Sequence, residues 1–267
     1  MARTPSAEYL ILDIETVPDL ERWKPPEVTE TTPVRTSGPF PPTWAHRIIV
    51  IGCLWLDHGY RLKRLGVVGD PGVRGDPGEV APDATADERE RHLLENFSRF
   101  VGKARPVLVT YNGRGFDLPV IAMRALCHGV SLGWYYREKN VRYRYSEEGH
   151  LDLCDWLADH GATRSGSLDA VARLIGLPGK TGIDGSQVEG LYNAGQLGEV
   201  QRYCLADVAQ TAFLFLRFRL LQGVLRPEAY HQATSTLLDA LAADGRVGNV
   251  LEGIDRAHLI GPQPGAA

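Results

Sequence analysis

The sequence YLILDIE, residues 9–15, is a short apolar run that ends in two carboxylates. An apolar run of this length with polar residues after it is typical of a buried β-strand. Side chains alternate across a strand, so Asp13 and Glu15 point to the same side. Two carboxylates so close repel each other unless a cation lies between them, and oxygen ligands suit Mg²⁺ or Mn²⁺. Taken alone, the Asp-x-Glu pattern also fits a strand that simply ends at the surface.

The segments around this strand predict one α/β domain. Short apolar runs and helical spacing alternate along the chain, beginning with antiparallel strands and ending in helices. The seven prolines of residues 17–45 and the Gly-X-Y triplets of residues 69–80 predict loops. The expected strands are 9–13, 47–56, 60–68 and 106–111, with one more left open before residue 152; the expected helices follow a capping box at Thr85-x-x-Glu88 and then occupy 118–128, 152–160, 167–175, 186–193, 196–222 and 227–243.

Composition excludes several classes of protein. The chain has 267 residues, 43% of them hydrophobic and 23% charged, which is an ordinary globular mixture. With 29 basic and 33 acidic residues the net charge is −4, so nucleic acid binding would need a local basic patch. The four cysteines form no CxxC pair, and no uninterrupted apolar run reaches about 18 residues. We therefore expect a soluble, reduced, cytoplasmic protein without a membrane segment.

Two further motifs carry chemistry. Residues 112–119, NGRGFDLP, follow a predicted strand, and Asp117 falls at a helix start where an N-cap is its plain structural interpretation. The paired glycines allow a tight turn and a close approach of backbone to a ligand. Tyr203 and Asp207 stand four apart on a long helix and so share one face. A buried Tyr–Asp hydrogen bond would also explain that pair.

The three motifs in this order, DxE, NxxxFD and YxxxD, form a specific set. The set resembles the DnaQ-like (DEDD) 3′–5′ exonucleases of the ribonuclease H-like fold, in the tyrosine-bearing DEDDy branch. The histidine-bearing branch has His where this chain has Arg202. The surrounding sequence is similar to a bacterial family of predicted exonucleases related to the proofreading domain of family B polymerases, in the stretches LDIETVPD, WAHRI, NGRGFDLP, HLDL, GLPGK and YCLADV.

The resemblance implies a ribonuclease H-like mixed β-sheet flanked by helices over residues 1–225, with residues 226–267 as a C-terminal helix and tail. It implies a stand-alone 3′–5′ exonuclease that uses two divalent cations, Mg²⁺ or Mn²⁺, to release 5′-mononucleotides from single-stranded or frayed DNA. The implied metal ligands are Asp13, Glu15, Asp117 and Asp207, with Tyr203 orienting the attacking water. Asn112 and Phe116 look like the family's contacts to the terminal nucleotide, although Phe116 also fits core packing.

Two weaker signals concern the substrate. Residues 134–145, WYYREKNVRYRY, interleave aromatic and basic residues as single-strand binding platforms do, which makes Arg142 and Arg144 candidates. Their alternation also fits a strand with one solvated face. Lys180 ends a Gly-rich loop that is not a P-loop, because residue 174 is Leu, and Lys180 is a further candidate for the substrate backbone. An exoribonuclease, and an inactive nucleic-acid-binding module, are the alternative functions.

Overall fold

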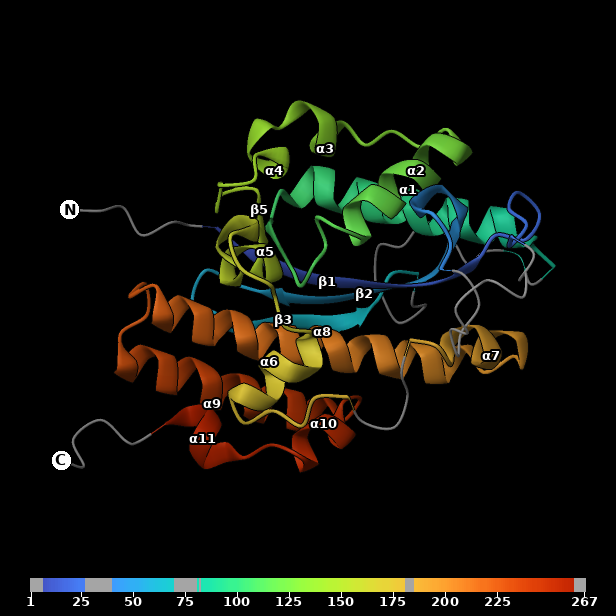
Figure 1. Ribbon diagram of the computed structural model, residues 1–267. Coiled ribbons are helices and arrows are strands. Elements are labelled where there is room, and N and C mark those ends of the chain that lie inside the picture. Colours follow the sequence, from blue (N-terminus) through green and yellow to red (C-terminus); the bar gives the residue numbers. More distant parts are fainter. Residues whose placement is uncertain (1–6, 27–39, 70–80, 82, 181–184, 262–267) are drawn as a thin grey trace.

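A mixed five-stranded sheet forms the centre of the computed structural model, which describes residues 7–26, 40–69, 81, 83–180 and 185–261 (Figure 1). The strands lie in the order β3-β2-β1-β4-β5. β1 runs antiparallel to β2 and parallel to β4, and β5 is parallel to β4. The strands are β1 (Tyr9–Pro18), β2 (His46–Leu56), β3 (Leu62–Val67), β4 (Val107–Thr110) and β5 (His150–Asp152).

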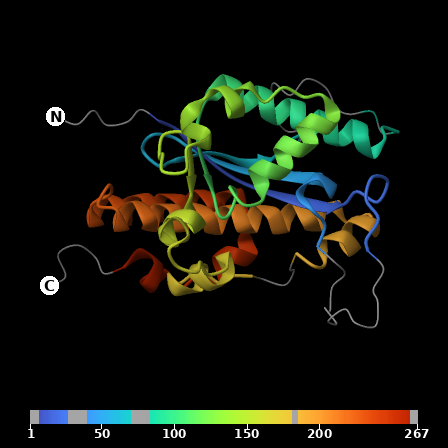
Figure 2. The ribbon, with the colours of Figure 1, turned by 45° about the horizontal axis from the view of Figure 1, so that its top comes forward.

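Helices cover both faces of the sheet. α1, α2, α3 and α4 lie on one face and α8 crosses the other, with α6 and α9–α11 outside α8 (Figures 1 and 2). The helices are α1 (Ala86–Ala104), α2 (Asp117–His128), α3 (Gly133–Arg137), α4 (Lys139–Arg142), α5 (Leu153–Leu157), α6 (Leu168–Leu174), α7 (Val188–Asn193), α8 (Leu197–Leu221), α9 (Pro227–Asp244), α10 (Gly248–Glu252) and α11 (Arg256–Ile260), with short 3₁₀ turns η1 (Thr43–Ala45) and η2 (Asp159–Gly161).

The alternation of β1 divides the core in two. Tyr9 and Ile11 face the cluster built on α8 and α9, whereas Leu10, Leu12 and Ile14 face the cluster under α1 and α2. The odd-numbered side of β1 therefore looks toward α8, and that is the side on which the carboxylates of the Asp-x-Glu motif follow. The C-terminal helices share the α8 cluster, so one continuous apolar core runs through both.

Most elements expected from the sequence are confirmed. The expected strands at 47–56 and 60–68 form the antiparallel pair β2–β3, and Thr85 caps α1 in a reciprocal capping box with Glu88. β1 is longer than predicted, since it continues to Pro18, and the strand left open is β5. The strand alternative for residues 142–145 is wrong, because Arg142 ends the short helix α4 and no strand follows before β5. Of the predicted loops at 17–45 and 69–80, residues 27–39 and 70–80 fall outside the described residues.

A buried ion network closes the end of β1. The Arg124 guanidinium, fully buried on α2, donates to Glu90 of α1 at 2.7 Å and to Asp19, just after β1, at 2.8 Å. Glu90 also accepts from the backbone N–H of Ile48 at 2.8 Å. These charge-assisted bonds join α1, α2, β1 and β2 at one point. Asp87, Glu90 and His128 lie close enough to share a cation. The two carboxylates, however, already form ion pairs with arginines, Asp87 with Arg22 and Glu90 with Arg124.

None of the helices in the described part of the chain combines the length and apolarity that crossing a membrane requires.

Candidate active site

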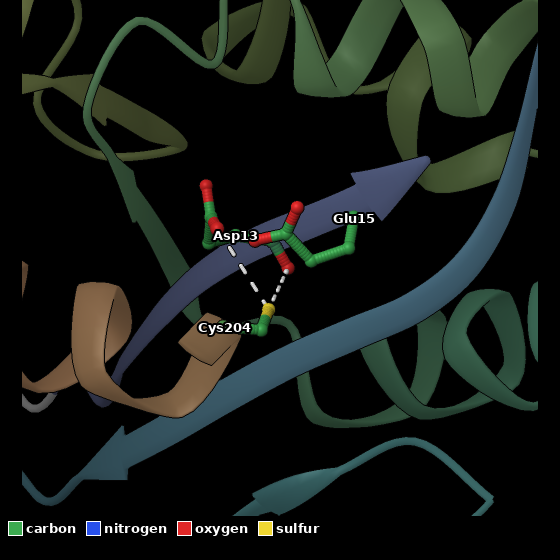
Figure 3. Close-up of side chains that lie close together, drawn as sticks. All are labelled: Asp13, Glu15 and Cys204. Carbon is green, nitrogen blue, oxygen red and sulfur yellow. Dashed lines mark hydrogen bonds between the residues drawn. The ribbon is translucent and has the colours of Figure 1, made fainter. Parts of the chain in front are cut away.

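The two carboxylates of β1 lie together on the face that α8 covers (Figure 3). One oxygen of Asp13, one oxygen of Glu15 and the Cys204 sulfur all lie within 4.8 Å of one another. Figure 3 shows the Glu15 side chain folding back toward Asp13, with Cys204 of α8 pointing at β1 from below. The Asp-x-Glu pair therefore belongs to an internal site, and the alternative of a strand ending at the surface is wrong, since Glu15 is buried.

Helix α8 brings the third motif to the same place. The Tyr203 hydroxyl donates a hydrogen bond to the Asp207 carboxylate, and both side chains are half-buried. Between them in the helix, the Cys204 thiol lies 3.5 Å from the Asp13 carbonyl oxygen and 3.7 Å from its carboxylate. α8 can approach the sheet this closely because β2 presents Gly52 there: a Cβ on Gly52 would lie 2.7 Å from the Cys204 sulfur.

Asp117 reaches β1 from the start of α2. Its carboxylate accepts a hydrogen bond from the backbone N–H of Ile14 at 3.2 Å, and the residue is only 3% exposed. The N-cap interpretation of Asp117 is wrong: Phe116 is the cap residue, without a capping side-chain bond, and Asp117 is the first residue of the helix. The side chain reaches the backbone of β1 between Asp13 and Glu15.

The loop before Asp117 is fixed by β5. The Asp152 carboxylate accepts from the backbone N–H groups of Asn112 and Arg114, each at 2.8 Å. Asn112 adopts the left-handed conformation, with φ of 66°. The two glycines serve close packing inside the loop, because a Cβ on Gly113 would lie 2.4 Å from Thr110 and one on Gly115 would lie 2.5 Å from Asn112. Asp152 and the two glycines therefore fix the loop that leads into Asp117.

The pKa values of all four carboxylates are raised, chiefly by burial. Burial is the largest cause for Asp13 and Glu15, whose pKa values are held well above their usual range, and the neighbouring carboxylates add to the shift. Burial also raises the pKa of Asp117 to about 7 and that of Asp207 to about 6, although the Tyr203 hydrogen bond opposes the latter shift. A raised carboxylate pKa means that the negative form is poorly compensated, so the positive charge around the described residues of the site is too small to neutralise its carboxylates.

Among the described residues, Lys180 is the cation seen to act on this cluster. Its charge lowers the pKa values of Glu15 and Asp207, opposing burial. Its own backbone N–H donates to Asp169 at 2.7 Å, and its side chain is exposed. One ammonium cannot balance four carboxylates. The donor set is made of oxygen atoms, with one thiol at its edge, and such a set fits hard divalent cations of the Mg²⁺ and Mn²⁺ type.

An aromatic cluster stands beside the carboxylates. The Phe116 ring, adjacent in the chain to Asp117, packs edge-on against His46 with 5.0 Å between centroids, and Phe40 lies 6.0 Å from Phe116. The His46 ring donates from Nε2 to the Pro41 carbonyl oxygen at 2.9 Å, so its Nδ1 accepts from the Thr16 hydroxyl at 2.9 Å. Phe40 is 69% exposed and presents an open ring face.

Arg142 and Arg144 are the basic candidates of residues 134–145, the segment that contains α4, and α4 lies on the same side of the sheet as α2. The Arg142 guanidinium lies 5.1 Å from the centroid of the Tyr136 ring. Arg144 forms a forked ion pair with Asp155, with Nε at 2.8 Å from one carboxylate oxygen. Arg114 links this segment to the site, because its guanidinium donates to the Arg142 carbonyl oxygen at 3.1 Å.

Three residues at or near the site were missed at the level of sequence. Asp152 caps the start of α5, and its carboxylate also holds the 112–114 loop. The sequence signal for Cys204 is its place between Tyr203 and Asp207. Phe40 stands in a proline-rich stretch without periodicity, and nothing in the pattern singled it out.

Comparison with known proteins places these observations in a family. Residues 38–253 match the family described as a predicted 3′–5′ exonuclease related to the exonuclease domain of PolB. The DNA polymerase epsilon catalytic subunit from Schizosaccharomyces pombe is 28% identical over 131 residues, which are 47% of this chain and 6% of that protein. Its counterpart from Dictyostelium discoideum is 34% identical over 89 residues, or 32% of this chain and 4% of that one. The chain thus spans a small part of the length of these relatives.

A solved structure shows the same fold. The family B DNA polymerase from the archaeon Pyrobaculum calidifontis aligns with a TM-score of 0.52 and 20% identity, over 92% of this chain and 27% of that one. The expected ribonuclease H-like α/β fold is thereby confirmed. The family match covers four-fifths of the chain, from before β2 to the residue after α10, and β1 precedes it. The chain belongs to the family of predicted 3′–5′ exonucleases related to the exonuclease domain of PolB.

Proposed function

We propose that this protein is a stand-alone, metal-dependent 3′–5′ exonuclease of the cytoplasm that releases 5′-mononucleotides from single-stranded or frayed DNA. The observation that carries the proposal is the convergence of Asp13, Glu15, Asp117 and Asp207 from β1, α2 and α8, with Lys180 acting on two of them. Buried carboxylates that gather at one place form a site suited to divalent cations.

In this proposal the four carboxylates would hold two cations, Mg²⁺ or Mn²⁺. Such cations stabilise the charge that develops on the attacking and leaving oxygens of a phosphodiester during in-line displacement. Asp13 would belong to both cation sites, Glu15 and Asp207 to the one beside the attacking water, and Asp117 to the second. The Tyr203 hydroxyl, already directed at Asp207, would orient the water.

The substrate end would meet the aromatic cluster. Phe116 belongs to the loop that leads into Asp117. Its ring would pack against the terminal base while Asn112 would contact the same nucleotide. Lys180, exposed and close enough to act on Glu15 and Asp207, would contact the phosphate backbone. Arg142 and Arg144 would hold the strand farther from its end, Arg144 after exchanging its Asp155 partner for a phosphate.

The experiment compares Asp13→Asn with wild type on 5′-labelled DNA and RNA oligomers, with Mg²⁺ or Mn²⁺. Asn keeps the volume and removes the charge, so we expect at least a 100-fold loss of hydrolysis with single-strand binding retained. Asp239→Asn, on the exposed face of α9, is the matched control for loss of one carboxylate. Activity of Asp13→Asn within tenfold of wild type would refute the site.

The same assay separates the alternatives. Shortening of RNA in preference to DNA would make the protein an exoribonuclease. Binding of either oligomer by the wild type, without hydrolysis under both metals, would make it an inactive nucleic-acid-binding module. We expect DNA to be shortened from its 3′ end, leaving a ladder of labelled products.

A further inference from the structure

A cavity of about 530 Å³ opens between the short helices α3 and α4. Its size lies within the range of small-molecule sites in proteins, about 300–1,000 Å³. Six consecutive or nearly consecutive residues line it: Tyr136, Glu138, Lys139, Asn140, Arg142 and Tyr143. Tyrosine, lysine and arginine side chains make up most of this lining, which is the combination found where proteins hold unpaired bases and phosphates.

The two tyrosines of the lining are exposed far beyond what packing requires. Tyr136 is 59% exposed and Tyr143 is 58% exposed. Arg142 lies 5.7 Å from the centroid of the Tyr135 ring as well as 5.1 Å from that of Tyr136, so its cation is held above aromatic faces. Open tyrosine rings next to a fixed guanidinium form a surface on which a base can stack while its phosphate meets the cation.

The charge of the cavity favours an anion. Lys139 and Arg142 contribute two positive charges, and neither forms an ion pair with the residues that the structure describes. Glu138 is the acid of the lining, and it faces Arg105 at 3.5 Å. The Asn140 amide donates to Glu148 at 2.8 Å, which keeps that carboxylate engaged outside the lining. The balance around the cavity is therefore positive, although the whole chain is acidic.

The cavity is connected to the candidate active site through one side chain. Arg114, which donates to the Arg142 carbonyl oxygen at 3.1 Å, belongs to the loop that ends in Phe116 and Asp117. α3 and α4 lie on the same side of the sheet as α2 (Figures 1 and 2). A strand whose end lies at Asp117 can thus pass over Arg114 toward the cavity.

We propose that this cavity is a subsite for an unpaired nucleobase of a single strand, 5′ of the nucleotide that is removed. The base stacks on Tyr136 and Tyr143, and its phosphate binds Lys139 and Arg142. The inference rests on the proposed function for its position relative to the hydrolysed end. A duplex keeps its bases stacked on one another, so the subsite selects single strands.

The test measures binding without hydrolysis. Oligomers of single-stranded DNA that carry the fluorescent base 2-aminopurine at successive positions from the 3′ end are titrated with protein in EDTA. We expect at least one internal position at which wild type changes the fluorescence by stacking, and the double variant Tyr136→Ala/Tyr143→Ala abolishes that change. The double variant should also bind about tenfold more weakly or worse, whereas Tyr136→Phe/Tyr143→Phe, which keeps the rings, should bind as wild type does.

Two controls make the result specific. Arg256→Ala removes a positive charge from α11, on the opposite side of the sheet, and should leave affinity and fluorescence unchanged. Melting temperatures of all variants establish that they are folded. Equal affinity and equal fluorescence for the alanine double variant and wild type would overturn the subsite, as would an equal loss of affinity for blunt duplex DNA. Because the readout is binding, hydrolysis by wild type tests the proposed function separately.

Discussion

Replacing Gly52 with Ala tests how closely α8 must approach the sheet. The added Cβ would lie 2.7 Å from the Cys204 sulfur and 3.2 Å from a Val208 methyl group. Ordinary contacts between such atoms are about 3.5–4.0 Å, so roughly 1 Å must be absorbed. Gly52 is paired with Asp13 on one side and with Val67 on the other. The sheet is therefore held in place, and α8 has to move.

The magnitude follows from the cost of overpacking a core, about 1–3 kcal/mol. For a chain of this size each kcal/mol lowers the melting temperature by roughly 2–4 °C, so the melting temperature should fall by roughly 2–12 °C. Hydrolysis should fall as well, because movement of α8 carries Tyr203 and Asp207 away from the β1 carboxylates. Thermal melts and the labelled-oligomer assay measure the two effects on the same preparation.

A second substitution identifies the contact. Cys204→Ala removes the sulfur, so the double variant Gly52→Ala/Cys204→Ala should recover about 1 kcal/mol or more relative to the sum of the single variants. Gly190→Ala in α7 is the matched control, because no atom lies within 4 Å of its added Cβ. If the two single effects simply add, the sulfur contact is not what limits the approach of α8, and the reasoning fails.

Two further predictions concern a hydroxyl and a buried carboxylate. Tyr203→Phe keeps the ring and loses the hydrogen bond to Asp207, so turnover should fall roughly 10- to 100-fold with oligomer affinity unchanged. Turnover is measured at saturating substrate and stability by thermal melting. A variant that is destabilised but fully active would show that this bond has only a structural role. Burial alone would raise the pKa of Asp19, but hydrogen bonds from Arg124, Arg22 and Arg47 lower it to about 2. A carboxylate whose pKa is lower in the folded than in the unfolded state stabilises the folded protein at pH values above the unfolded pKa, near 3.8, and this stabilisation is lost as the pH falls toward 2. The difference in unfolding free energy between wild type and Asp19→Asn, measured by urea denaturation, should therefore narrow by about 2 kcal/mol from pH 5 to pH 2. A gap that stays constant over this range would contradict the assignment.

Elements with local signals were predictable from the sequence. The Asp-x-Glu pair at the end of an apolar run placed two carboxylates on one side of β1, and alternation alone is enough for that inference. The capping box of Thr85 and Glu88 and the proline in the first turn of α2 are likewise short-range features. The resemblance supplied what periodicity could not, namely that motifs about 100 and 190 residues away meet the first one.

The misses share a physical cause. α3 and α4 have five and four residues, too few to show a helical period, so the alternating letters of residues 142–145 favoured a strand. Asp152 looked like an ordinary helix-start residue because its other partners, Asn112 and Arg114, are about 40 residues away in sequence. Asp117 was assigned to its own helix, whereas its partner is Ile14 on another element.

β1 is paired unequally along its two edges. β2 accompanies it from Tyr9 to Pro18, but β4 accompanies it only from Tyr9 to Ile11. Beyond that point the Asp117 carboxylate takes the Ile14 N–H and supplies the hydrogen bond that a neighbouring strand would have made. Asp117→Ala would therefore remove the acceptor of the Ile14 N–H together with the proposed metal-binding carboxylate. Asparagine keeps an acceptor oxygen for the Ile14 N–H and removes the charge. Asp117→Asn is therefore the variant that tests the chemical role of this carboxylate separately from its structural role.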